Sequence, residues 1–126
     1  KYPEGPGDER LRDPSVTWPH TRAQVAAMSA FEAKAAGTVA NENMAKLGIA
    51  WVTYHGRRID HREKRKGEFY RLIRAAEQAK LDQNPAVAEI LRKTGTLQLR
   101  PDHHQTPDAA PAMKYNEIWM EIRAQP

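Results

Sequence analysis

The sequence contains no cysteine among its 126 residues. This absence excludes disulfide bonds, thiolate nucleophiles and cysteine-ligated zinc, and it leaves the redox compartment undetermined. The chain also lacks any apolar run near the roughly 18 to 20 residues that a membrane-spanning helix needs. Its first residues are polar and do not follow the basic-then-apolar order of a signal peptide. We therefore expect a soluble protein with no membrane partner, cytoplasmic by default.

Familiar catalytic motifs are also missing from the sequence. It has no Gly-x-Ser-x-Gly elbow, no phosphate-binding glycine-rich loop and no dinucleotide fingerprint. His103 and His104 are the only adjacent histidines, and adjacent side chains rarely converge on one metal ion. We therefore expect neither a metal nor a cofactor, and local motifs alone do not identify a reaction.

The composition is that of a small folded protein. Apolar residues make up 40% and charged residues 29% of the chain, which is enough apolar material for one core beneath a highly charged surface. A chain of this length usually forms one domain. Because the sequence starts at Lys1 and not at methionine, we expect the natural polypeptide to begin upstream, as a larger parent chain or a processed one.

The net charge of +4 is unevenly distributed. Six basic residues fall within ten positions, interrupted by Asp60 and Glu63: Arg57, Arg58, Arg62, Lys64, Arg65 and Lys66. Such a run attracts phosphate groups in a salt-dependent way, but a solvated helix start has the same composition. Charge alone therefore leaves both interpretations open.

The order of breakers and apolar positions predicts a helix-rich α+β single domain with a few short strands. Six prolines and glycines in residues 1–19 favour an extended N-terminal arm, followed by a domain over residues 20–126. Apolar spacing predicts the remaining elements: helices at 21–36, 41–47, 62–81, 85–93 and 116–123, and strands at 49–54 and 97–99.

Particular residues should end the helices, cap them and fill the core. Gly37 suits a helix end, while Asn84 and Asn116 can cap the helices that follow them. The predicted core consists of Phe69, Leu72, Ile73, Ile90, Leu91, Ile118 and Ile122.

From about Met44 to Arg123, three segments, in their order along the chain, resemble the NADAR family. The first is Asn43-Met-Ala-Lys-Leu-Gly48, followed by the basic Arg57-Arg-Ile-Asp-His61. The second and most specific is Ala79-Lys-Leu-Asp-Gln-Asn-Pro85 with Ile90-Leu-Arg-Lys-Thr-Gly95, which is similar to the family's Ala-Lys-Phe-x-Gln-Asn-Pro and Leu-Leu-x-Thr-Gly. The third, Ile118-Trp-Met-Glu-Ile-Arg123, is similar to its closing Leu-Met-Glu-Val-Arg. An early Thr17-Trp-Pro19 is similar to the family's Thr-Trp-Pro.

Members of that family cleave N-glycosidic bonds in riboflavin-pathway intermediates or remove ADP-ribose from bases. The resemblance thus implies an N-glycosidase-like domain that acts on or binds a phosphorylated ribosylated base, either as a small molecule or as nucleic-acid-linked ADP-ribose. A carboxylate would stabilise the oxocarbenium-like sugar in such a reaction. The candidates are Glu32 and Asp102, with His61 as the group that contacts the base or handles the proton. The candidate ligand-binding residues are Trp18, Arg57, Arg58, Arg62 and Lys80.

The sequence also departs from the family pattern. It has no Glu-His pair after Trp18-Pro19, His61 stands where members carry tryptophan, and Pro101-Asp-His-His104 replaces the late Asp-x-x-Trp-Gly. A chain that keeps the scaffold and changes polar positions fits either a new substrate specificity or a loss of catalysis with binding kept, because a conserved fold does not guarantee a conserved function. The alternative is a non-catalytic binding or assembly module within a larger protein or complex.

Overall fold

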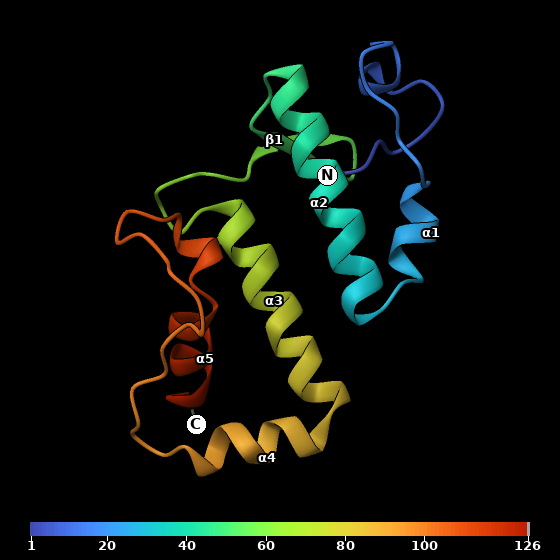
Figure 1. Ribbon diagram of the computed structural model, residues 1–126. Coiled ribbons are helices and arrows are strands. Elements are labelled where there is room, and N and C mark those ends of the chain that lie inside the picture. Colours follow the sequence, from blue (N-terminus) through green and yellow to red (C-terminus); the bar gives the residue numbers. More distant parts are fainter. Residues whose placement is uncertain (126) are drawn as a thin grey trace. The chain divides into compact units, whose positions relative to one another are not determined.

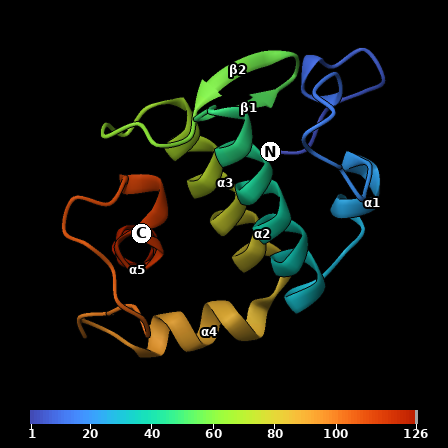
Figure 2. The ribbon, with the colours of Figure 1, turned by 45° about the horizontal axis from the view of Figure 1, so that its top comes forward.

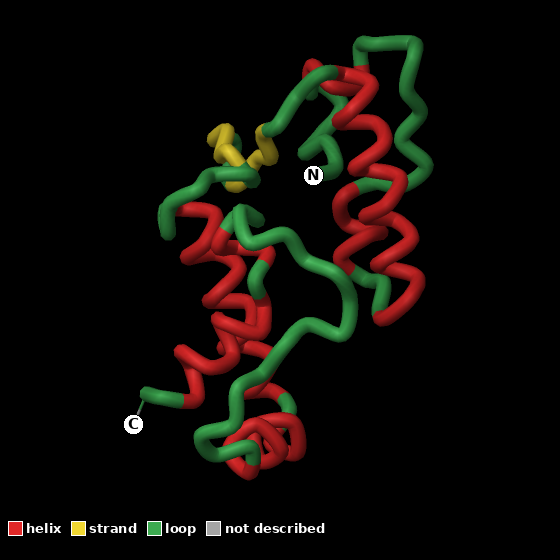
Figure 3. The backbone as a smooth tube through the Cα atoms, turned by 60° about the vertical axis from the view of Figure 1, so that its left-hand side comes forward, coloured by secondary structure: helices red, strands yellow, loops and turns green. Residues whose placement is uncertain are grey.

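Helices dominate the structure, a computed structural model that describes residues 1–125 (Figures 1 and 3). A single two-stranded antiparallel sheet accompanies them within that range. The expected helix-rich α+β class is therefore confirmed. The chain divides into two compact units, Lys1–His61 and Arg62–Pro126, which are described in turn.

The N-terminal unit is built on two helices and a hairpin. Its elements are a 3-10 turn η1 (Glu9–Leu11), helices α1 (Arg22–Ala26) and α2 (Ala30–Leu47), and strands β1 (Trp51–Tyr54) and β2 (Arg57–Asp60). Helix α1 packs on α2, and the hairpin lies beyond the C-terminal end of α2 (Figure 2). Its core cluster joins the Tyr2 ring to two small residues of α2, Ala36 and Ala40.

Two glycines in left-handed conformation shape the end of α2 and the hairpin. Gly48 has φ of 67° and ends α2, where the amide of Ile49 reaches back to the carbonyl of Met44. His55 and Gly56 both have positive φ, as a two-residue hairpin turn with the twist of its strands requires. That turn sets the register that pairs Val52 with Ile59 on the buried face.

The C-terminal unit consists of three helices and a 3-10 turn. Helix α3 (Glu68–Gln83) turns at Asn84 into α4 (Pro85–Lys93), and a long loop leads through η2 (Pro111–Met113) to α5 (Tyr115–Arg123). Helix α5 runs beside α3, and α4 contacts both (Figure 1). The core cluster of this unit contains Tyr70, Leu81, Ala112, Ile118 and Ile122.

Several predicted boundaries are wrong. The helix expected at 21–36 is two helices, with a break around Ser29 and Ala30, whose φ is 49°. Gly37 lies inside α2, which also contains the segment expected as a separate helix at 41–47. An interior glycine costs only about 1 kcal/mol, so it does not end a helix that packing supports.

In the C-terminal half, α3 starts at Glu68, later than expected, because residues 62–67 form turns and bends. Residues 97–99 form a loop, not a strand. Asn84 precedes α4, but its side chain makes no capping hydrogen bond within the described residues. The side-chain amide of Asn84 donates instead to the Lys80 carbonyl at 2.7 Å. Asn116 lies inside α5 and donates to the Leu99 carbonyl, so Lys114 takes the N-cap position.

Candidate functional site

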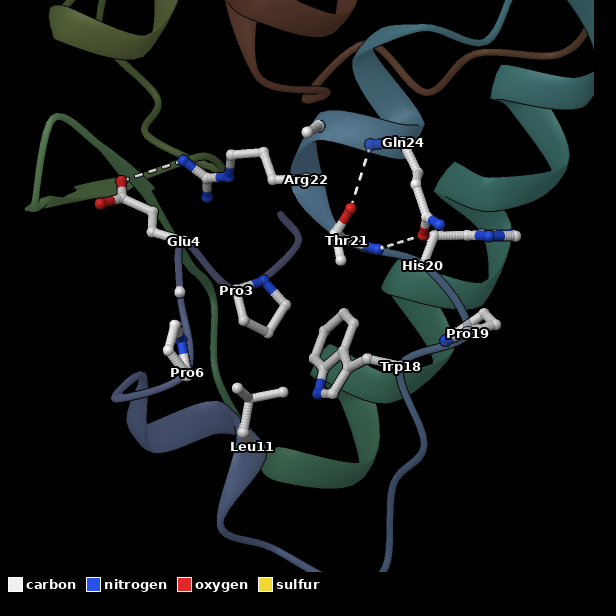
Figure 4. A pocket seen from close by; sticks show the side chains of 12 residues that line it. Pro3, Glu4, Pro6, Leu11, Trp18, Pro19, His20, Thr21, Arg22 and Gln24 are labelled. Carbon is white, nitrogen blue, oxygen red and sulfur yellow. Dashed lines mark hydrogen bonds and ion pairs between the residues drawn. The ribbon is translucent and has the colours of Figure 1, made fainter.

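The N-terminal unit contains a pocket of about 530 Å³ beside the start of α1 (Figure 4). Prolines and large apolar side chains form most of its wall, and a few polar groups lie among them. The apolar wall consists of Pro3, Pro6, Leu11, Trp18 and Pro19. Concave sites of this size with few polar groups are where proteins usually bind small ligands.

The indole of Trp18 is held in place by its neighbours. Its Nε1 donates to the carbonyl of Arg10 at 3.1 Å, and its ring meets the Tyr2 ring edge to face at 5.3 Å. Tyr2 is itself fixed, because its hydroxyl donates to the Ala36 carbonyl in α2 at 2.9 Å. Since Trp18 also lines the pocket, the cavity has a rigid aromatic wall.

The charged residues of the pocket mainly bind other parts of the protein. Arg22 donates to the carbonyl of Tyr2, to Thr53 and to the carboxylate of Glu4, 2.9 Å away. Glu4 also accepts from the amide of Gly56 at 3.1 Å, and that bond is the main cause that lowers the pKa of Glu4. This network ties the pocket wall to the hairpin and leaves the guanidinium of Arg22 engaged.

The remaining polar residues belong to the start of α1. The Thr21 hydroxyl accepts from the Gln24 amide at 3.1 Å, and the Gln24 side chain accepts from the Thr21 amide at 2.8 Å, as the dashed lines in Figure 4 mark. This reciprocal capping box fixes the entry of α1 beside the pocket. His20 precedes it and lines the same cavity.

Sequence reasoning predicted Trp18 as a ligand-binding residue, and Trp18 lines this pocket. It did not predict Pro3, Leu11, His20 or Arg22, because residues 1–19 were expected to form an extended arm. That segment contains η1 and contributes the buried side chains of Tyr2 and Arg10. No local motif indicates this packing, since it depends on contacts with α2 and the hairpin.

The basic run from Arg57 to Lys66 falls into both units. Arg57 and Arg58 lie on β2, and Arg58 pairs with Glu9 and stacks over Trp51 at 4.2 Å. Arg62 begins the C-terminal unit, in which Lys66 pairs with Glu121. Acidic partners thus offset part of the positive charge of the run.

The catalytic candidates Glu32 and His61 lie near opposite ends of α2. Glu32 is exposed in the first turn of α2. His61 is buried just beyond the other end, where its Nδ1 lies 2.7 Å from the Ala50 carbonyl oxygen. The helix between Glu32 and Leu47 alone spans about 22 Å at 1.5 Å per residue. The structure therefore does not bring these two side chains together.

The other two candidates lie in the C-terminal unit. Asp102 is fully exposed, its carboxylate oxygen lies 3.0 Å from Nδ1 of His103, and it lines a pocket of about 330 Å³. Lys80 lines a neighbouring pocket of about 300 Å³. The functional roles of all these residues stay predictions.

Other kinds of site are not found in residues 1–125. That range holds no group of three or more histidine, aspartate or glutamate side chains arranged to bind a metal. None of its helices combines the length and apolar character needed to cross a membrane.

No protein-family model, curated protein or solved structure matches the chain.

Proposed function

We propose that the protein binds a phosphorylated ribosylated base and that the pocket around Trp18 receives the base. The rigid indole in a mainly apolar cavity is the observation that carries this proposal. Aromatic side chains bind nucleobases by stacking, which contributes about 1 to 3 kcal/mol per base. The resemblance of Thr17-Trp-Pro19 and the later segments to NADAR proteins supports the same class of ligand.

The phosphate would bind outside the apolar pocket. Arg22 already donates to Tyr2, Thr53 and Glu4, so it is a poor phosphate ligand. The hairpin turn touches the pocket wall through the bond from Gly56 to Glu4, and the exposed Arg57 follows directly. Guanidinium groups bind phosphate oxygens well, so Arg57 is our candidate for this contact.

The resemblance implies a domain that acts on or binds such a ligand, and of these two, binding is better supported than N-glycoside hydrolysis. Hydrolysis needs a carboxylate and a proton-handling group at the same sugar, and Glu32 and His61 lie near opposite ends of α2. Binding requires only the pocket. Hydrolysis would be detected separately, by chromatography of the same protein and ligand mixtures for released free base.

The test is calorimetric titration with ribose 5-phosphate, ADP-ribose and a ribosylaminopyrimidine phosphate. We expect the two ligands that carry a base to bind and ribose 5-phosphate to bind at least tenfold more weakly. Leu11→Asp places a charge in the pocket at a residue that is 45% exposed, so the fold should persist while affinity falls about tenfold or more.

Phe31→Asp is the matched control, because Phe31 is 84% exposed in the same unit and does not line the pocket. Arg57→Ala should weaken the phosphorylated ligands more than their dephosphorylated forms, and added salt should reduce that difference. The absence of heat at millimolar ligand would refute the proposal.

A further inference from the structure

A second surface lies in the C-terminal unit and plays no part in the proposed ligand site. Two pockets, of about 300 and 330 Å³, adjoin there because both are lined by Leu99 and Trp119. Their lining residues come from α3, α4, α5 and the loop that contains Leu99. We call these two adjoining pockets together the Trp119 groove.

The α4 end of the Trp119 groove is apolar and exposed. Val87, Ile90 and Leu91 follow helical spacing on one face of α4, where Leu91 also packs against the core. Ile90 is 66% exposed, as is the nearby Leu97 just after the helix. Apolar side chains that cluster around a hollow are more informative than scattered ones, since such clusters mark interaction sites.

Two cationic side chains, Lys80 and Arg100, line the groove, and Asp102 lines it as well. The ammonium group of Lys80 lies 5.8 Å from the centre of the Trp119 ring, and Arg100 lines the other pocket. Glu89 on α4 is paired with Arg92 and Lys93, and Asp102 is paired with His103, so these two acids are themselves engaged.

We propose that the Trp119 groove docks an amphipathic helix of another protein, with apolar residues on one face and acidic residues beside them. The apolar residues at the α4 end of the groove would contact side chains spaced three and four residues apart along the partner helix, as in other complexes in which a helix binds a groove. Charge complementarity with Lys80 and Arg100 favours an acidic partner. A second copy fits less well, because the chain carries a net charge of +4 and a two-fold contact brings the same basic surface against itself.

The probe is a labelled 18-residue helical peptide with leucine along one face and glutamate on the others, used with the full chain. Its counterpart has lysine in place of glutamate. Fluorescence anisotropy should give at least tenfold tighter binding of the acidic peptide at low salt. Ile90→Ser should weaken the acidic peptide by at least tenfold, and Lys80→Glu should weaken it while strengthening the basic one.

Phe31→Ser is the control, because it removes an exposed apolar side chain from the other unit and should leave binding unchanged. Circular dichroism of each variant separates loss of binding from loss of fold. Equal affinity for the two peptides, or unchanged binding by Ile90→Ser, would overturn the proposal. So would concentration-dependent dimers in sedimentation velocity that Ile90→Ser abolishes, since a second copy would then occupy the groove.

Discussion

Arg10 is a charged side chain buried in the N-terminal unit, with only 2% of its surface exposed. Its guanidinium makes two bonds to Asp8, at 2.9 and 2.8 Å, and donates to the Lys1 carbonyl and to the Thr53 hydroxyl. A buried arginine is tolerated when its charge is paired and its donors are satisfied. The hydrogen bond from Arg10 holds the pKa of Asp8 well below its usual range.

We expect Asp8→Asn to destabilise the protein by about 3 kcal/mol, near the lower end of values for breaking a buried ion pair. Asp8 itself keeps some solvent contact, with 12% of its side chain exposed. Urea unfolding followed by circular dichroism measures the change, and Glu42→Gln on the exposed side of α2 is the control. A loss as small as that of the control would show that Arg10 does not depend on Asp8.

The same pair makes stability depend on pH. Because the folded-state pKa of Asp8 is lowered, its contribution is fully present above the unfolded value of about 3.9 and is lost as the pH falls toward the folded value. The stability difference between the parent and Asp8→Asn should therefore shrink as the pH falls from about 5 to 2. A constant difference over that range would contradict this linkage.

Individual core residues could be predicted from the sequence only in part. Ile118 and Ile122 were expected in the core and are buried, at 0% and 7% exposed. Ile90 was also expected there, but it is 66% exposed. Helical spacing identifies the apolar face of α4, but it does not tell whether another element covers that face.

Among the elements, α4 was predicted with its observed bounds, since Pro85 opens it and Gly95 follows it closely. The strand β2 was missed, because its charged residues suggested a helix start, and only Ile59 points to a buried face. The turn at His55 and Gly56 was its one local signal. Short elements that depend on a partner strand carry little signal of their own.

Two glycines of α2 offer a matched pair of substitutions. Gly37 lies inside the helix, and an added Cβ would meet no described atom within 4 Å, so Gly37→Ala should stabilise the protein by about 0.5 to 1 kcal/mol. Gly48 ends the helix at φ of 67°, so Gly48→Ala should destabilise it by about 1 kcal/mol. Thermal unfolding of both variants measures the two shifts, and shifts of the same sign would contradict the helix bounds.

For the whole molecule, the division of the chain falls at the basic run. Arg62, Lys64 and Arg65 are exposed in turns between β2 and α3. The candidate site was predictable from the sequence only through Trp18, because the other pocket residues come together through packing over long sequence distances. The basic run was recognised as a feature, but its division between two units was not foreseen.

We expect brief trypsin treatment to cleave the chain within residues 62–66, because exposed turns are preferred sites of proteolysis. Mass spectrometry should find two fragments, each of about half the chain. Arg71 and Arg74 lie within α3 and serve as internal controls, since helical backbone resists cleavage. Early cuts after either of them would show that α3 is less stable than the turns before it.

The three tryptophans are distributed unevenly between the units: Trp18 and Trp51 lie in the first, and Trp119 lies in the second. Trp51 has the guanidinium groups of Arg10 and Arg58 within 5 Å of its ring, while Trp119 is half-buried against the core of its own unit. Intrinsic emission therefore reports each half separately once the other tryptophans are replaced by phenylalanine. Coincident denaturation curves from the two reporters would mean that the halves unfold as one cooperative unit, and separated curves that each half has a stability of its own.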